Sequence, residues 1–483
     1  MRRTFAVGLI LFGLVAGVAR VALVQESPRP SPRTAIYSLE REAVNPTPGQ
    51  SNTQVEPDSF AWGSKIVATY QSWRIVDGGA AALGWATSAD AGVHWRTGTL
   101  PLGGYVAASD PVVAFDAAHH VWLISGIGFR GRYHDAFVAR STDGLTWSGP
   151  VVAAGNEDED HDKEWVSCDN GVRSPFRGRC YLAYVDTVEW LLGIRSSDDG
   201  GQTWSNPAHL QPGVTGPGAV FSGPVPVTRP NGDLVVPYSF FAPLGNTRGV
   251  AEEDRVAAVV SHDGGATFTQ PIRVAALEAA DDLAGIRAPA LPSAAVDKAG
   301  KLYVAWQDGR FRSRGGANDV VFSTSTDGAQ WTQPARIRMS GAPTYILPAI
   351  AVDPATSGAK AHVAVAYYSV HVSPRCATFV PGCYDEIDAW LVQSLNGGRT
   401  WSTPRKLNAQ SMQIEWLADT TLGAMLGDYI SVSYVRGQPV PVLALASPPS
   451  AAGHSESIFT CRLNTPAPRF PMRVSSPCRR PSP

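Results

Sequence analysis

The sequence is poor in charge and contains no long basic run. Charged residues make up 17% of its 483 residues, and the formal net charge at pH 7 is −2. Binding to nucleic acid through neutralisation of phosphates is therefore not expected. Apolar residues still make up 44% of the chain. The low hydrophobicity and high charge of disordered chains are thus absent, and the chain can build a large core.

Cofactor and metal motifs are also missing. No glycine-rich strand–turn–helix motif occurs, so a nucleotide, haem or flavin site is not expected. No Cys-x-x-Cys occurs, which argues against zinc. The six cysteines permit 15 pairings, but they lie in three close pairs, and short loops close at low entropic cost. We therefore predict local disulfides and an oxidising compartment. The predicted pairs are Cys168–Cys180, Cys376–Cys383 and Cys461–Cys478.

A single apolar run, residues 5–19, is preceded by two arginines. It is short for a membrane span, so we predict a signal peptide within residues 1–24 and an exported, secreted protein. An uncleaved N-terminal anchor is the alternative. Residues 25–51 are predicted to be a Pro/Ser-rich linker and residues 466–483 a C-terminal tail.

The pattern Ser-x-Asp-x-Gly-x-Thr-Trp, or a close variant, occurs six times. Its aromatic residues are 52 to 70 residues apart, a spacing typical of repeated supersecondary units. Asp or Asn can accept hydrogen bonds from backbone amides two or three residues on, and Gly tolerates positive φ. We therefore predict six hairpin turns whose aromatic residue begins the next strand. The repeats start at Ser88, Ser141, Ser197, Ser261, Ser325 and Ser394.

Two β-rich runs and a short third precede each repeat, and a fourth follows it. Four antiparallel strands, repeated, form the blade of a β-propeller. We therefore predict an all-β propeller of four-stranded antiparallel blades over residues 52–465. In the second unit the strands are predicted at 112–115, 121–124, 136–140 and 147–151. In the fifth unit they are predicted at 294–296, 302–306, 320–323 and 331–336.

The blade pattern restarts after the sixth repeat. Residues 428–434, 440–446 and 455–463 are predicted to be three strands of a further blade. Residues 33–40 would supply its outer strand and close the ring. Seven blades are therefore favoured over six.

The six turns match the Asp boxes, or BNR repeats, of the sialidase superfamily, which the chain resembles over residues 52–450. Short phrases such as Asp162-Lys-Glu164-Trp165 also resemble secreted bacterial exo-α-sialidase-like proteins. The resemblance implies a glycoside hydrolase that acts on terminal, acidic sugars. In sialidases three arginines hold the substrate carboxylate, an Asp is the acid/base, and a Tyr with a Glu forms the nucleophilic pair. The phrase Phe/Tyr-Arg-Ile-Pro around the first arginine does not occur here.

Candidate site residues follow from propeller topology. The starts of the first strands and the loops between second and third strands lie opposite the repeats, around the central channel. Carboxylates there can act as acid and base, and arginine can bind a carboxylate in bidentate fashion. The candidate catalytic residues are Asp110 as acid/base, Tyr429 as nucleophile and Glu164 as its base. The candidate substrate-binding residues are Arg74, Arg287, Arg310, Glu56 and Asp308. For Asp308 and Arg310, which lie two residues apart in one loop, a structural ion pair is the alternative.

The remaining expectations concern ligands and alternatives. The acidic stretch 157–162 is interpreted as a solvated loop, with a Ca²⁺ site as the alternative; no other cofactor is expected. The expected partner is a glycan, and the expected state is a monomer. A non-catalytic propeller that binds glycans or proteins is the alternative to an enzyme, followed by a scaffold without a small-molecule site. Three arginines converging on one carboxylate-sized space favour the enzyme, whereas arginines tied to neighbouring carboxylates do not.

Overall fold

The computed structural model describes residues 49–461, apart from 132, 156–159, 211–219, 243–252, 281–282, 284, 313–316, 340–342, 373–383 and 451–452. The chain divides into two compact units, Met1–Pro46 and Thr47–Pro483, and all described residues belong to the second. The predicted signal peptide or anchor, most of the linker and the C-terminal tail lie outside the described residues. Among the described residues, no helix is long and apolar enough to cross a membrane.

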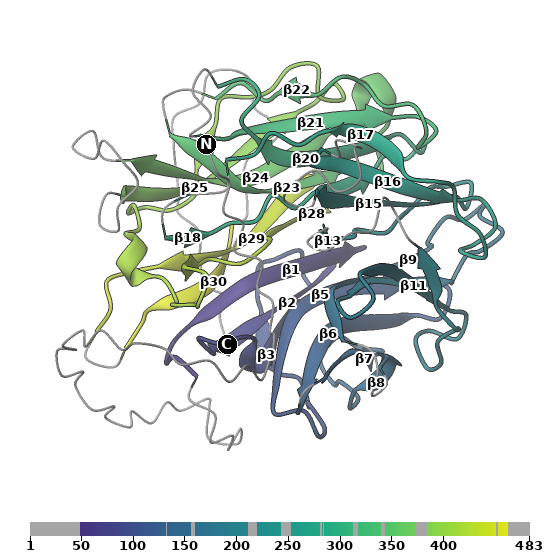
Figure 1. Ribbon diagram of the computed structural model, residues 1–483, viewed down its shortest axis with the longest axis horizontal. Coiled ribbons are helices and arrows are strands. Elements are labelled where there is room, and N and C mark those ends of the chain that lie inside the picture. Colours follow the sequence, from purple (N-terminus) through teal and green to yellow (C-terminus); the bar gives the residue numbers. More distant parts are fainter. Residues whose placement is uncertain are drawn as a thin grey trace, which may run out of the picture. The chain divides into compact units, whose positions relative to one another are not determined.

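The described residues form the all-β propeller of antiparallel blades that the sequence predicted (Figure 1). They contain no α-helix, only the 3-10 turns η1 (Gly358–Lys360) and η2 (Ile414–Trp416). The first two blades share one sheet: β1 (Gln54–Trp62), β2 (Lys65–Arg74), β3 (Ala80–Ser88), β4 (Arg96–Thr99), β5 (Ala107–Asp116), β6 (Val121–Arg130), β7 (Tyr133–Ser141) and β8 (Val151–Ala154).

The following sheets repeat this order along the chain. One contains β9 (His161–Cys168), β10 (Cys180–Asp186), β11 (Leu191–Ser197) and β12 (Ala208–Leu210). The next contains β13 (Val220–Ser222), β14 (Val227–Thr228), β15 (Leu234–Phe241), β16 (Arg255–Ser261) and β17 (Ile272–Ala276). A further four-stranded sheet contains β19 (Ser293–Val296), β20 (Leu302–Asp308), β21 (Asp319–Ser325) and β22 (Ala335–Arg336). Another contains β23 (Thr344–Val352), β24 (Val363–Val372), β25 (Tyr384–Ser394) and β26 (Arg405–Lys406).

A three-stranded sheet ends the described fold: β28 (Ser431–Val435), β29 (Gln438–Ala446) and β30 (Glu456–Thr460). The innermost strands β1, β5, β9, β14, β19, β23 and β28 contact one another in that order, and β28 returns to β1. A separate parallel pair joins β18 (Ile286–Arg287) to β27 (Ala424–Met425). Residues 33–40, predicted to supply one more strand, lie outside the described residues, so the number of blades stays a prediction.

Each Ser-x-Asp repeat forms the turn between the third and fourth strand of its blade. In the third blade the Ser197 hydroxyl donates to Asp199 Oδ1 at 2.8 Å and accepts the Gly201 amide at 2.9 Å. Asp199 Oδ1 also accepts the amides of Gln202 and Thr203 at 2.8 and 2.9 Å. The turn is therefore closed by bonds within seven residues, which is why its sequence alone predicts it.

One detail of the predicted turns is wrong. The aromatic residue does not begin the fourth strand in any of the six repeats. It lies one residue before β4 in the first blade and four residues before the fourth strand in the others, as Trp147 does before β8 and Trp331 before β22. Trp331 instead donates its indole N–H to the Gly328 carbonyl of the turn at 2.9 Å. The ring serves to close the turn, and the outer strand begins only after the chain has left it.

Blades pack face to face, so innermost and central strands lose their exposed side. Every position of β5 and β20 is buried. The predicted disulfide Cys168–Cys180 is confirmed and joins β9 to β10. The other two predicted pairs include Cys376, Cys383 and Cys478, which lie outside the described residues.

Candidate active site

The innermost strands share a β-bulge close to where they start. The ladder slips after Val55 in β1, after Ser109 in β5 and after Ile346 in β23. A residue with positive φ lies at each of these bulges: Glu56, Asp110 and Leu347. Lys163 in β9, whose ladder also slips, and Gly223 after β13 have positive φ as well.

The conformation at these bulges is costly for any residue other than glycine, by about 1–3 kcal/mol each. Proline follows Glu56, Asp110, Gly223 and Leu347, and it suits a bulge because it has no N–H to contribute to a ladder. A bulge also changes the direction of the side chain it carries. The repeated bulge thereby brings side chains from different blades to a common position.

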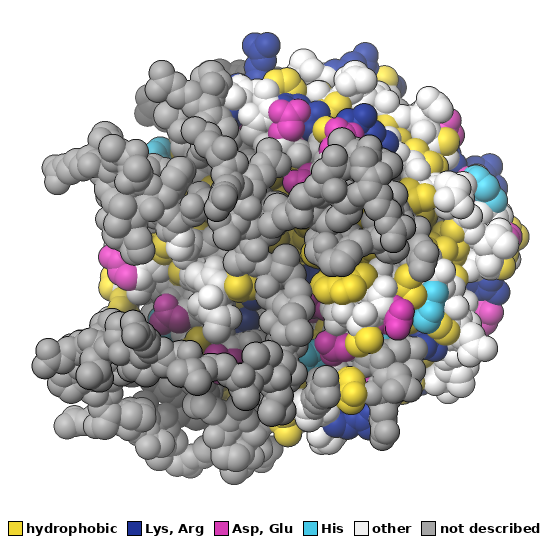
Figure 2. All heavy atoms as spheres, in the orientation of Figure 1, with side chains coloured by type: hydrophobic (Ala, Val, Ile, Leu, Met, Phe, Trp, Pro, Cys, Tyr) yellow, Lys and Arg dark blue, Asp and Glu magenta, His cyan; other side chains and the backbone are white. Residues whose placement is uncertain are grey.

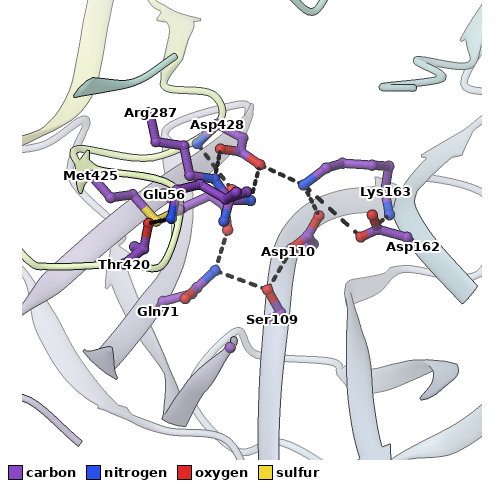
Figure 3. A network of polar contacts seen from close by, with 12 residues as sticks. Glu56, Gln71, Ser109, Asp110, Asp162, Lys163, Arg287, Thr420, Met425 and Asp428 are labelled. Carbon is purple, nitrogen blue, oxygen red and sulfur yellow. Dashed lines mark hydrogen bonds and ion pairs between the residues drawn. The ribbon is translucent and has the colours of Figure 1, made fainter. Parts of the chain in front are cut away.

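Asp428 and Arg287 form the most closely bonded pair at this position (Figure 3). Arg287 Nε donates to Asp428 Oδ1 at 2.6 Å and its NH2 group donates to Oδ2 at 2.5 Å. Burial opposes ionisation of Asp428, but Arg287 and Lys163 outweigh it and lower the pKa of this carboxyl. Arg287 owes its place to the parallel pairing of β18 with β27.

Lys163 bridges two blades and the segment before β28. Its Nζ lies 2.5 Å from Asp428 Oδ2 and 3.1 Å from Asp110 Oδ2. Its side chain is 11% exposed, while those of Asp110 and Asp428 are 4% and 1% exposed. Burial disfavours the ammonium form, yet the two carboxylates raise the pKa of Lys163 well above its usual value.

Glu56 is fully buried beside this network (Figure 3). Its Oε1 accepts the Asp428 amide at 3.0 Å, and its Oε2 accepts the Gln71 amide group. Burial, followed by the charges of Asp110 and Asp428, raises the pKa of Glu56 to about 8. At neutral pH this carboxyl is therefore mostly protonated.

Glu164 and Tyr429 lie beside the same network. Both carboxyl oxygens of Glu164 are buried without a hydrogen-bond partner among the described residues. Burial, with the charge of Asp110, raises the pKa of Glu164 well above its usual value. The Tyr429 hydroxyl donates to the Pro111 carbonyl at 3.1 Å, and the Tyr429 ring meets Trp165 edge to face. Burial and the neighbouring carboxyls Glu56 and Asp110 raise the pKa of Tyr429.

These groups open on a pocket with a cavity volume of about 30 Å³, which we call the axial pocket. Its wall combines charged groups with an apolar surface, the usual composition of a small-molecule site. The lining residues come from strands β5, β9, β19 and β23 and from segments beside β13, β14, β18 and β28: Asp110, Lys163, Glu164, Trp165, Gly223, Val225, Pro289, Leu291, Pro292, Ser293, Leu347, Pro348, Asp428, Tyr429 and Ile430.

The three predicted substrate arginines do not converge. Arg287 belongs to the axial network. Arg74 is 2% exposed, and its guanidinium donates to the carbonyls of Ile75 and Gly79 and to Met425 Sδ. Arg74 is therefore occupied within the fold rather than directed at a ligand.

Arg310 lies in a different network, in the connection from β20 to β21. Its Nε donates to Asp308 Oδ1 at 2.8 Å and its NH2 group to Asp308 Oδ2 at 2.7 Å. The indole N–H of Trp306 also donates to Asp308, at 2.9 Å. Asp308 and Arg310 thus form a buried pair within one blade, and neither lines the axial pocket.

Four members of the site carried no assigned role from sequence: Lys163, Asp428, Gln71 and Ser109. Gln71 Nε2 donates to Ser109 Oγ at 3.1 Å, and Ser109 Oγ donates to Asp110 Oδ1 at 2.5 Å. The signal that could have found Lys163 is its place in β9, which matches that of Glu56 in β1 and Asp110 in β5. Asp428 also lies where an innermost strand is about to start, but the sequence did not show its role, because its partners are 141 and 265 residues away.

No group of three or more His, Cys, Asp or Glu side chains in the described part of the chain could hold a metal ion. Residues 157–159 of the acidic stretch, where a Ca²⁺ site was the alternative interpretation, lie outside the described residues.

No protein-family model and no curated protein matches the chain. Solved structures of similar fold include a polysaccharide lyase of family PL25, an ulvan lyase, at 11% identity and a TM-score of 0.51, covering 86% of this chain and 96% of that chain. A Hadza microbial sialidase, Hz136, is 16% identical over 79% of this chain and 73% of that chain, with a TM-score of 0.46. The α-L-arabinofuranosidase Arb93A from Fusarium graminearum is 12% identical over 86% and 95%, also at 0.46. At such identities the likeness concerns the fold alone.

Proposed function

We propose that the protein acts on glycans and hydrolyses glycosidic bonds in the axial pocket. One observation carries the proposal: the pocket holds a carboxyl kept in its acid form, Glu164, beside carboxylates that contact cations, Asp110 and Asp428. Glycoside hydrolysis uses one carboxylic acid and one carboxylate on either side of the bond. Two carboxyl groups with opposite charge states in one pocket meet that requirement.

Glu164 is assigned as the proton donor to the leaving oxygen. Its burial maintains the acid form, and neither of its oxygens is committed to a hydrogen bond among the described residues. Asp110 is assigned as the base that takes a proton from the attacking water, with Lys163 Nζ holding its Oδ2 at 3.1 Å. The proton lost by Glu164 and the proton gained by Asp110 balance over one turnover.

Tyr429 is the alternative nucleophile. Its pKa is raised and its hydroxyl is bonded to the Pro111 carbonyl, so it attacks only after a neighbouring carboxylate takes its proton. Without that transfer, Tyr429 and Trp165 form an aromatic wall for a sugar ring.

The fold comparison supports glycans as the ligand class, because the similar lyase is named for a polysaccharide that it acts on. A sialidase-type clamp of three arginines is not part of the proposal. Arg74 and Arg310 are bonded to backbone carbonyls and Asp308, which leaves Arg287 and Lys163 as the cations of the axial network.

The test is release of fluorophore from a panel of glycosides, with sialic acid, arabinofuranose and neutral hexopyranoses, by the full chain. We expect Glu164→Gln and Asp110→Asn each to lower kcat by about 10²- to 10⁴-fold, the usual range for a lost acid or base. Asp308→Asn is the matched control, since it removes a buried carboxylate outside the pocket, and its kcat should stay within about 2-fold.

Two results would overturn the proposal. A wild-type chain that turns over no glycoside, yet binds glycans, would show a binding propeller instead. Cleavage of a polysaccharide that yields an unsaturated sugar would show elimination rather than hydrolysis. Loss of activity in Tyr429→Phe equal to that in Asp110→Asn would support the tyrosine as nucleophile.

A further inference from the structure

We propose that a groove at the outer edge of the β19–β22 blade binds an anionic segment of a glycan chain, away from the bond that is cut. The groove has a volume of about 580 Å³ and is lined by Phe311, Pro334, Ala335, Arg336, Arg338 and Met339. The inference rests on the proposed function, because it names the substrate class that the axial pocket would cleave.

The groove lies in a local excess of positive charge. Arg312 and Arg336 share one carboxylate, with NH2 groups 2.6 and 3.0 Å from Asp319 Oδ1. Arg310 already saturates Asp308 nearby. Figure 2 shows dark blue side chains, with magenta ones between them, at the edge of the face that β22 occupies in Figure 1.

Arg338 adds a further charge. It is exposed, and no carboxylate among the described residues lies within salt-bridge distance of it. The four arginines Arg310, Arg312, Arg336 and Arg338 therefore outnumber the described carboxylates beside them, which are Asp308, Asp319 and Glu278, the last bonded to Asp308 through its backbone amide. Guanidinium groups bind carboxylates and sulfates in bidentate fashion, so an anionic ligand is the complementary one.

The groove also offers an apolar surface for a ring. Phe311 is 43% exposed, although large aromatic side chains usually lie inside. Pro334 and Met339 are half-buried beside it. A sugar ring presents C–H groups on its faces and polar groups at its rim. Phe311 between arginines fits an acidic sugar better than it fits a compact inorganic anion.

Part of the charge is held in place before any ligand binds. The Arg312 NH2 group donates to the Pro343 carbonyl at 3.1 Å as well as to Asp319, and its guanidinium lies over the Tyr345 ring. Arg312 Nε, Arg336 Nε and Asp319 Oδ2 are buried without a partner among the described residues. An ordered cation loses little entropy when it binds, which favours affinity.

The groove and the axial pocket belong to one blade. Ser293 of β19 lines the pocket, and Arg336 of β22 lines the groove. Ser293 pairs with Ala305, at the middle of β20. Arg336 pairs with Val321, beside the middle of β21, so the two residues lie at about the same level along the strands. Three inter-strand gaps separate β19 from β22, about 14 Å at the usual spacing. A ligand that reaches both places must be an oligosaccharide or a polymer, not a single sugar.

The experiment measures binding of the full chain to a polyuronate, to a sulfated polysaccharide and to neutral dextran of matched length. We expect the wild type to bind the anionic polymers more tightly, with an affinity that falls as salt is raised. Arg338→Ala and Phe311→Ala should each weaken anionic binding by about 5- to 10-fold, as expected for one lost charged or aromatic contact. Arg96→Ala, an exposed arginine of β4, is the matched control and should stay within about 2-fold.

The groove proposal would be overturned if Arg338→Ala bound the polyuronate as tightly as the wild type does, or if the wild type bound dextran and polyuronate equally tightly. Displacement of the polyuronate by a short single-stranded DNA at equal concentration would show a general polyanion site and overturn the glycan assignment. Glu164→Gln separates the two proposals, because it should lose turnover and keep anionic binding. If the chain turns over small glycosides but its binding of anionic polymers does not depend on the groove residues, the groove proposal alone is wrong. If binding depends on the groove residues but no glycoside is turned over, the proposed enzymatic function alone is wrong.

Discussion

The two ends of the blades use carboxyl groups in opposite ways. At the turn end, the amides of Thr146 and Leu145 lower the pKa of Asp143 to about 2, and the hydroxyl and amide of Thr267 lower that of Asp263 to about 2. At the axial end, burial raises the pKa of Glu56 to about 8 and that of Glu164 well above its usual value.

The difference is one of partners. Turn carboxylates are bonded to their own backbone within four residues, so each stabilises a local structure and reacts with nothing else. Axial carboxyls from different blades have one another as neighbours, together with Lys163 and Arg287. Neighbouring charges at a buried site give some carboxyl groups a raised pKa and others a lowered pKa, which is a condition for acid–base chemistry. The turn end should therefore control stability, and the axial end should control both stability and activity.

The largest effect is expected from removing the central cation. Lys163→Met leaves Asp110 and Asp428 buried without their shared ammonium, and a buried charge that loses its partner costs about 3–5 kcal/mol. Urea unfolding at pH 8 measures this loss in the free energy of unfolding. Lys65→Met at the turn end, where the ammonium donates to the Asp143 carbonyl and to no other described residue, should change the free energy of unfolding by less than about 1 kcal/mol. Similar losses in the two variants would contradict the comparison.

The disulfide tests the turn end. Cys168–Cys180 closes the β9–β10 hairpin at the end where the repeats lie, with a sequence separation of 12. Replacing both cysteines by serine should lower the free energy of unfolding by about 3 kcal/mol. Glycosidase kcat at a temperature well below unfolding should not change, because the axial bulge of β9 at Lys163 is held by its own strand pairing. A selective loss of kcat would show that the two ends are coupled.

The sequence predicts the turn end of the blades better than the axial end. The turns and blades were predictable because Asp199 and its amides are neighbours in the chain. The axial network was predictable only in part. Glu56, Asp110 and Arg287 were selected from topology, but a one-residue bulge decides which side chain points to the axis, and a period-two pattern does not show it. For Arg310 the sequence left open a substrate contact or an ion pair with Asp308, and the structure shows the ion pair.

The pH dependence of stability sharpens the comparison. Glu56 and Asp58 have pKa values raised to about 8 and about 7 in the fold, above those of the unfolded chain. The folded state therefore binds more protons between those values, and the free energy of unfolding falls as pH rises from about 4.5 to about 8. The slope is up to about 1.4 kcal/mol per pH unit for each such carboxyl. Urea unfolding across this range measures it, and Glu56→Gln should flatten the slope.

The smallest expected effect concerns a single turn. Asp263 accepts the Thr267 amide at 2.9 Å and a hydrogen bond from the Ser261 hydroxyl at 2.8 Å. Asp263→Ala removes these bonds from an exposed site that water can resolvate, so we expect a loss of about 1 kcal/mol, measured as a lower Tm. Asp263→Asn keeps the acceptor oxygen and should recover most of that loss, as Asn396 does in the equivalent repeat by accepting the Thr400 amide at 2.9 Å. An Asn variant as unstable as the Ala variant would mean that the charge, rather than the hydrogen bonds, stabilises this turn.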